Sequence, residues 1–136
     1  MKYLILILIP FLSFSQSEVP DEYWINDGNF QEKINEHKAF GDDNTKPVVI
    51  EFWAKFNDIN CFGEWKQLQN ATYYRVDIAE APETKKKYRV RMAPTIIIFK
   101  GGIKETVFKA GLDLELPAGL EEIQEAIDEV NQASKF

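Results

Sequence analysis

The 136-residue sequence has one cysteine, Cys61, and one histidine, His37. A single cysteine excludes a disulfide within the chain, so the hydrophobic core has to hold the fold without a covalent crosslink. His37 lies among polar residues, and we expect neither a metal site nor a Cys–His catalytic pair. Glycine-rich phosphate loops and serine nucleophile elbows are also missing. No metal or other cofactor is therefore expected.

No apolar run is long enough to span a membrane. The run at residues 3–12 is about half of the roughly 20 residues required, and Pro10 interrupts it. It follows a basic start and precedes small residues, an order typical of a secretory signal peptide. We predict that residues 1–15 are a signal peptide, that residues 16–136 form one domain, and that the protein is exported, periplasmic or secreted, with no membrane insertion after cleavage.

Acidic residues outnumber basic residues by 22 to 16, which gives a net charge of −6, and removal of the signal peptide changes this to −7. Nucleic acid and anionic membranes bind clustered lysine and arginine, so the overall charge disfavours both as partners. Hydrophobic residues make up 45% of the chain and aromatic residues 13%, enough for one core.

Runs of apolar and β-branched residues predict four to five strands. The runs at 47–54 and 95–99 are nearly uninterrupted, which is typical of strands covered on both faces of a sheet. Gly101-Gly102 predicts a hairpin that makes the last two strands antiparallel neighbours. The predicted strands are residues 23–25, 47–54, 72–78, 95–99 and 103–109.

Helical spacing of apolar residues predicts four helices between or after these strands. Strand–helix–strand units give parallel strands with helical crossovers, and the final hairpin adds antiparallel ones. The expected architecture is an α/β fold with a mixed sheet and helices on both faces. The predicted helices are residues 30–38, residues 57–68 capped by Asn57 or Asp58, residues 82–88, and residues 119–132.

Three segments resemble the thioredoxin family, and the match runs over residues 47–130. Residues 46–54, which end in Phe52-Trp53-Ala54, are similar to the family's central strand. Residues 90–102 resemble the segment with the family's cis-proline, and residues 109–111 resemble the end of its last strand. The resemblance implies a thioredoxin-like three-layer sandwich.

The family's redox motif is missing. Counting on from Trp53, the positions that match its Cys-Gly-Pro-Cys are Asn57, Asp58, Ile59 and Asn60. A thioredoxin needs two thiols that form and break one disulfide. Dithiol oxidoreductase activity is therefore not expected.

Cys61 lies one residue beyond the second motif position. On the predicted helix its side chain would be rotated by about 100° from the family's resolving cysteine, and one turn inside the helix the stabilisation of a thiolate has faded. Three roles remain: an inert helix residue, which we favour; a thiol that forms an intermolecular disulfide or is redox-regulated; and a monothiol catalyst. Lys55 and Lys66 would favour a thiolate, but flanking surface lysines are common.

Glu51 matches the buried acid that, in the family, assists proton transfer to the resolving thiol. Since no such thiol is present, we favour a structural role, with the carboxyl held by polar neighbours such as Asn60. Burial should raise its pKa.

The resemblance also implies a cis Ala93–Pro94 peptide bond, which exposes the Ala93 backbone for pairing with an extended peptide. Such a groove can persist without the thiols. Its predicted apolar lining is Trp53, Phe56, Ala93, Pro94 and Gly111.

These observations lead to one preferred function and two alternatives. We favour a non-catalytic protein- or peptide-binding or adaptor module of the cell envelope, whose partner the sequence does not identify. One alternative is a redox protein that acts through Cys61 alone, by glutathione-type exchange or peroxide reduction. The other is a structural role within a larger envelope complex.

Overall fold

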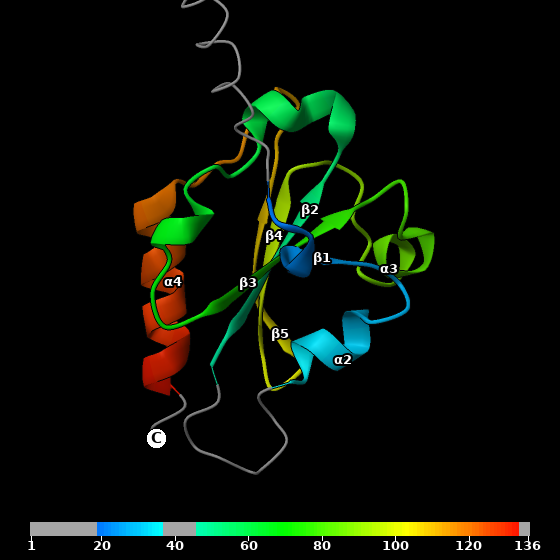
Figure 1. Ribbon diagram of the computed structural model, residues 1–136. Helices are drawn as coiled ribbons and strands as arrows, with labels where there is room; N and C mark the ends of the chain where they lie inside the picture. The colour runs from blue at the N-terminus through cyan, green and yellow to red at the C-terminus, as the bar shows by residue number, and fades with distance from the viewer. Residues whose placement is uncertain (1–18, 37–45, 134–136) are drawn as a thin grey trace, which may run out of the picture.

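The computed structural model describes residues 19–36 and 46–133. Within these ranges five strands form one mixed sheet in the order β1-β3-β2-β4-β5 (Figure 1). β1, β3 and β2 are parallel, whereas β4 is antiparallel to β2, and β5 to β4. The predicted strands are thus all present, and the α/β fold class is confirmed. The strands are Trp24–Ile25 (β1), Val48–Trp53 (β2), Thr72–Asp77 (β3), Thr95–Lys100 (β4) and Ile103–Lys109 (β5).

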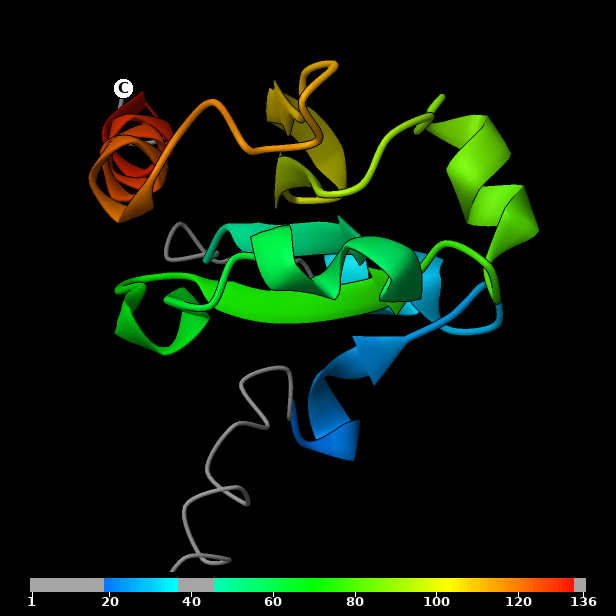
Figure 2. The same cartoon turned by 90° about the horizontal axis from the view of Figure 1, so that it is seen from above.

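Helices cover both faces of the sheet (Figures 1 and 2). α2 (Phe30–Ile34) and α3 (Pro82–Lys87) lie on one face, and Phe30 of α2 packs there with Phe52 and Phe99. α4 (Leu120–Ala133) lies on the other face, where its Ile123 and Ile127 join a second core cluster. Each strand supplies both clusters because successive side chains point to opposite faces.

The signal peptide predicted at residues 1–15 lies outside the described residues, as do His37 and the end of the predicted helix 30–38. The described part of that helix ends at Ile34, with Asn35 as its C-cap. No helix in the described ranges has both the length and the apolar character needed to cross a bilayer.

The helix predicted over residues 57–68 is wrong. Two short 3₁₀ segments, η4 (Lys55–Asn60) and η5 (Trp65–Gln67), take its place, and Asn57 inside η4 has non-helical dihedral angles (φ −123°, ψ 30°). Asparagine and aspartate side chains compete for backbone hydrogen bonds and disfavour helix interiors. Gly63, between the two segments, also has low helix propensity. Cys61 therefore follows η4 in an extended conformation (φ −67°, ψ 162°), and the predicted rotation around a helix does not apply.

The start of α3 is held from another part of the chain. Its N-cap, Ala81, has no side-chain acceptor, and Asp27 supplies one from the loop after β1. The Asp27 carboxylate accepts hydrogen bonds from the Glu83 N–H (3.1 Å), the Thr84 N–H (2.8 Å) and the Thr84 hydroxyl (2.6 Å). The bond from the Thr84 side chain is the main cause that lowers the pKa of Asp27. These contacts fix α3 and the segment that follows it.

Candidate functional site

The residues that replace the redox motif lie where β2 ends and η4 begins. Asn57, at the first cysteine position, is only 6% exposed. Its Nδ2 donates to the carbonyl oxygens of Ala93 and Leu114, both at 2.8 Å. One amide group thus joins η4 to the segment before β4 and to the loop after β5.

Asn60, at the second cysteine position, is bonded to the first. Its Nδ2 donates to Asn57 Oδ1 at 2.8 Å. The Asn57 amide then uses both of its N–H groups and its carbonyl, which satisfies a buried group with demanding geometry. A hydrogen bond between two asparagines stands where the family has its disulfide.

The Ala93–Pro94 peptide bond is cis. Ala93 is 2% exposed and Pro94 is also buried. The predicted exposure of the Ala93 backbone is wrong, because the residue is almost wholly buried and its carbonyl oxygen accepts a hydrogen bond from Asn57.

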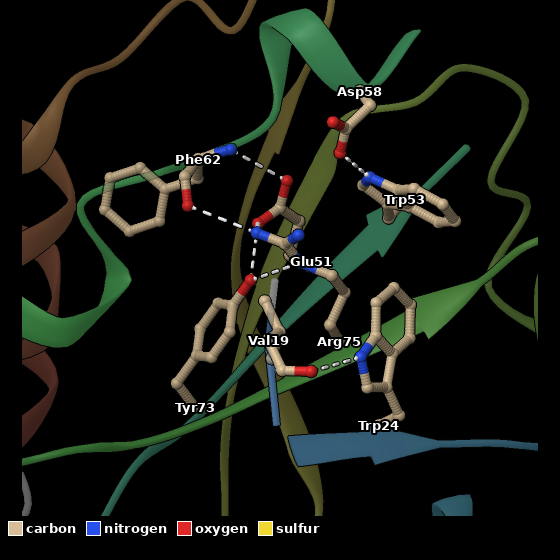
Figure 3. Close-up of polar contacts among 8 residues, drawn as sticks. All are labelled: Val19, Trp24, Glu51, Trp53, Asp58, Phe62, Tyr73 and Arg75. Atoms are coloured by element: carbon tan, nitrogen blue, oxygen red, sulfur yellow. Dashed lines mark hydrogen bonds and ion pairs between the residues drawn. The ribbon is translucent and has the colours of Figure 1, made fainter. Parts of the chain in front are cut away.

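The remaining residues of the predicted groove belong to the segments that meet at this contact and differ in exposure. The half-buried Trp53 donates from Nε1 to Asp58 Oδ1 at 2.7 Å and packs edge-on against Trp24 (Figure 3). Phe56 and Gly111 are exposed. The structure therefore brings Asn57, Asn60 and Ala93 together, and of the five predicted groove residues it buries Ala93 and Pro94, half-buries Trp53 and exposes Phe56 and Gly111.

Three large apolar side chains are exposed around this site. Phe56 and Ile59, both on η4, are 75% and 91% exposed, and Leu112, in the loop tied to η4 through Asn57, is 100% exposed. We refer to Phe56, Ile59 and Leu112 as the apolar surface. An exposed apolar area marks an interaction site when its side chains are close together, and here Phe56 and Ile59 share the short segment η4.

Glu51 is fully buried beneath η4 and has three hydrogen-bond donors (Figure 3). Its Oε1 accepts from the Tyr73 hydroxyl (2.6 Å) and Arg75 Nη2 (3.2 Å), and its Oε2 accepts from the Phe62 N–H (2.9 Å). Asn60, the predicted neighbour, is bonded to Asn57 instead. Burial raises the pKa of Glu51, and the Arg75 charge opposes this shift.

Arg75, which the sequence did not single out, is fully buried. Besides pairing with Glu51, it donates from Nε to the Tyr73 hydroxyl (2.8 Å) and lies against the Trp24 ring, with Cζ 5.7 Å from its centroid. Its Nη1 has no hydrogen-bond partner among the described residues. The signal in the sequence was a charged residue, Arg75, within the β-forming run 72–78. In the structure the pairing of β2 with β3 places it directly opposite Glu51.

Cys61 is half-buried and free. Burial raises the pKa of its thiol, the Arg75 charge lowers it, and the Glu51 and Asp58 carboxylates raise it further. The cation that influences the thiol is thus Arg75 rather than the surface lysines considered from the sequence. A raised pKa leaves little thiolate at neutral pH, which disfavours a nucleophilic role.

Because the pKa of the Cys61 thiol is raised, we expect the rate of its exchange with a small aromatic disulfide to depend on pH differently in the folded and unfolded chain. In the folded protein the rate should still be rising above the ordinary thiol pKa, because burial raises the pKa of Cys61. The same chain unfolded in urea should level off near its ordinary value, about 8.5. A folded-state plateau below about pH 8 would show an activated thiolate and contradict the inert assignment.

The described residues contain no group of three or more histidine, cysteine, aspartate or glutamate side chains that could hold a metal ion.

Comparison with known proteins gives consistent matches. The Thioredoxin family model matches residues 22–122. The chain is 30% identical over 100 residues to thioredoxin M4 of the Arabidopsis thaliana chloroplast, which is 65% of this chain and 44% of that protein. It is 31% identical over 86 residues to the thioredoxin of Alicyclobacillus acidocaldarius subsp. acidocaldarius, and the match covers 57% of this chain and 73% of that protein. The chain spans less than half of the chloroplast relative's length.

Among solved structures, Schistosoma mansoni thioredoxin matches with a TM-score of 0.58 at 22% identity, over 85% of this chain and 97% of that one. At this identity the match supports the fold alone.

Proposed function

This chain belongs to the thioredoxin family, and from that premise we propose that it is an exported, non-catalytic protein- or peptide-binding module of the cell envelope. Its single cysteine cannot carry out a dithiol cycle within the chain. The relatives' printed names identify them as thioredoxins. The scaffold that they share is retained here, whereas the motif positions contain other residues.

The observation that carries the proposal is the set of hydrogen bonds made by the buried Asn57 side chain. A residue that hydrogen-bonds Asn60, Ala93 and Leu114 at once fixes three segments relative to one another. A fixed loop arrangement favours binding, because little conformational entropy is lost when a partner docks. The former redox end of the fold thus supports a rigid surface.

The apolar surface is the proposed contact area. Phe56, Ile59 and Leu112 expose apolar area that a partner would remove from water, and each fully buried side chain of this size contributes about 1.5–3 kcal/mol. Because Ala93 and Pro94 are buried, the partner would contact η4 and the 110–119 loop instead of pairing with the Ala93 backbone.

The test begins with recovery of the partner from the native envelope fraction and continues with the purified pair. The variant Phe56→Ser/Ile59→Ser should weaken binding by about tenfold or more, measured by calorimetry. Ile103→Ser, which removes a 64% exposed side chain at the β4–β5 hairpin, is the matched control and should bind as the wild type does. Equal affinities for all three proteins, or no retained partner, would refute the proposal.

A further inference from the structure

A cavity of about 560 Å³ lies between the segment after α3 and the β4–β5 hairpin. Four cationic side chains line it: Arg89, Arg91, Lys104 and Lys109. No carboxylate is among its lining residues. Its volume is within the range of small-ligand sites, about 300–1,000 Å³. We refer to it as the cationic cavity.

A β-bulge produces this charge pattern. Ile98 pairs with Thr106, but the next residue of β4, Phe99, pairs with Lys104, so Glu105 is the extra residue of β5. Cross-strand partners share a face, which places Lys104 on the cavity side with Ile97 and Val107. Burial lowers the pKa of Lys100, and the nearby Glu105 charge partly opposes this shift. Without the bulge, Glu105 would occupy the place of Lys104.

A second cavity, about 570 Å³, adjoins the first and extends the positive surface. The two share Arg89 and Arg91, and the second adds Lys85 and Lys86, again with no carboxylate in its lining. Arg89, between them, has a left-handed backbone (φ 55°) because it follows the C-cap of α3 in a Schellman motif, in which the Arg89 N–H donates to the Lys86 carbonyl and the Val90 N–H to the Lys85 carbonyl. In a chain with a net charge of −6, six cations are thus gathered in one region.

The floor of the cationic cavity is apolar, with Val90, Met92, Ile97 and Val107 among its lining residues. Cations around an apolar floor suit carboxylates interspersed with apolar side chains, as in an acidic peptide. Arg91-Met92 leads directly into Ala93, and Lys109-Ala110 into Gly111, so the cavity adjoins the candidate site. A nucleic acid is a less suitable occupant, because its phosphates would extend beyond the cavity and the net negative charge of the chain opposes them.

We propose that the cationic cavity binds an acidic segment of a protein partner, with arginines forming paired hydrogen bonds to carboxylates and the lysines acting as point charges. The inference rests on the proposed function, since it names the chemistry of the bound protein.

The experiment uses a labelled peptide of about ten residues rich in glutamate, with some leucine, and a matched peptide with glutamine in place of glutamate. Fluorescence anisotropy should show binding of the glutamate peptide alone, weakening as salt increases. Lys104→Glu/Lys109→Glu should lower the affinity about tenfold or more, and Lys104→Gln/Lys109→Gln by less. Lys66→Glu, an exposed charge reversal next to Trp65 in the core cluster of the opposite face, should have no such effect.

Three results would overturn the proposal: equal binding of the glutamine peptide, an equal loss with Lys66→Glu, or displacement of the peptide by a single-stranded oligonucleotide at lower concentration than by unlabelled peptide. Phe56→Ser/Ile59→Ser should bind the peptide normally, because the apolar surface lies outside the cavity lining. Failure of the proposed function and failure of the cationic cavity are therefore distinguishable.

Discussion

Replacing Arg75 with methionine is expected to lower the free energy of unfolding by about 3–5 kcal/mol, because it leaves the Glu51 carboxylate buried without its countercharge. Both side chains are fully buried, and the substitution also removes the bond to the Tyr73 hydroxyl. Urea denaturation followed by tryptophan fluorescence would measure the loss.

A double variant separates the ion pair from simple packing. Glu51→Gln/Arg75→Met keeps a side-chain oxygen for the Phe62 N–H or the Tyr73 hydroxyl but removes both charges. It should lie within about 2 kcal/mol of the wild type, since a buried pair replaced as a unit is often nearly neutral. The single variants Glu51→Gln and Arg75→Met complete the cycle. If the double variant loses as much stability as the two single variants added together, the two charges are not coupled and our account of this cluster is wrong.

Asn57→Asp is expected to cost at least about 3 kcal/mol, although it changes a single atom. It places a buried carboxylate oxygen against the carbonyl oxygens of Ala93 and Leu114, where two N–H···O bonds now exist. Asn57→Ala should cost less, about 2 kcal/mol, because it leaves the carbonyls unpaired without adding repulsion.

Asn60→Ala is the control for the hydrogen bonds of Asn57 to the two loops. It removes one bond, the one to Asn57 Oδ1, and should cost about 1 kcal/mol or less. Denaturation of the four proteins at pH 7 would give the order wild type, Asn60→Ala, Asn57→Ala, Asn57→Asp. An Asn57→Asp protein as stable as Asn57→Ala would show that the amide does not bridge the two loops.

The strands could be predicted from the sequence because their signals are local. β2 and β4 are almost wholly buried, as their nearly uninterrupted apolar runs predict. The Gly101-Gly102 hairpin was also predictable, since both glycines have positive φ values (57° and 81°) that other residues rarely adopt. α4 followed from the spacing of Ile123, Ile127 and Val130, all of which are buried.

The region between β2 and β3 was less predictable, because contacts distant in sequence determine it. The spacing of Phe62, Trp65 and Leu68 suggested a helix, but Asn57 bonds Ala93, 36 residues away, and the Phe62 N–H donates to Glu51. Arg75 was missed for a related reason: its partner is on another strand, and the register that aligns it with Glu51 is not visible in either segment alone.

The positions that replace the redox motif were predictable from the sequence only in part. The sequence identifies Asn57 and Asn60 as replacements for cysteines, but only the structure reveals the hydrogen bond between them and the burial of Ala93 beside them. The structure therefore shows the Ala93 carbonyl already bonded within the chain, with exposed apolar side chains on η4 and on the loop after β5.

Binding without thiol chemistry is the central claim, and partner affinity measured for Cys61→Ser beside Ile59→Ser tests it most directly. The serine replaces a half-buried thiol with a raised pKa, whereas the second change removes a 91% exposed apolar contact. We predict that Cys61→Ser binds the partner as tightly as the wild type and that Ile59→Ser binds it about fivefold to tenfold more weakly. Loss of binding in Cys61→Ser, with Ile59→Ser unaffected, would contradict the account.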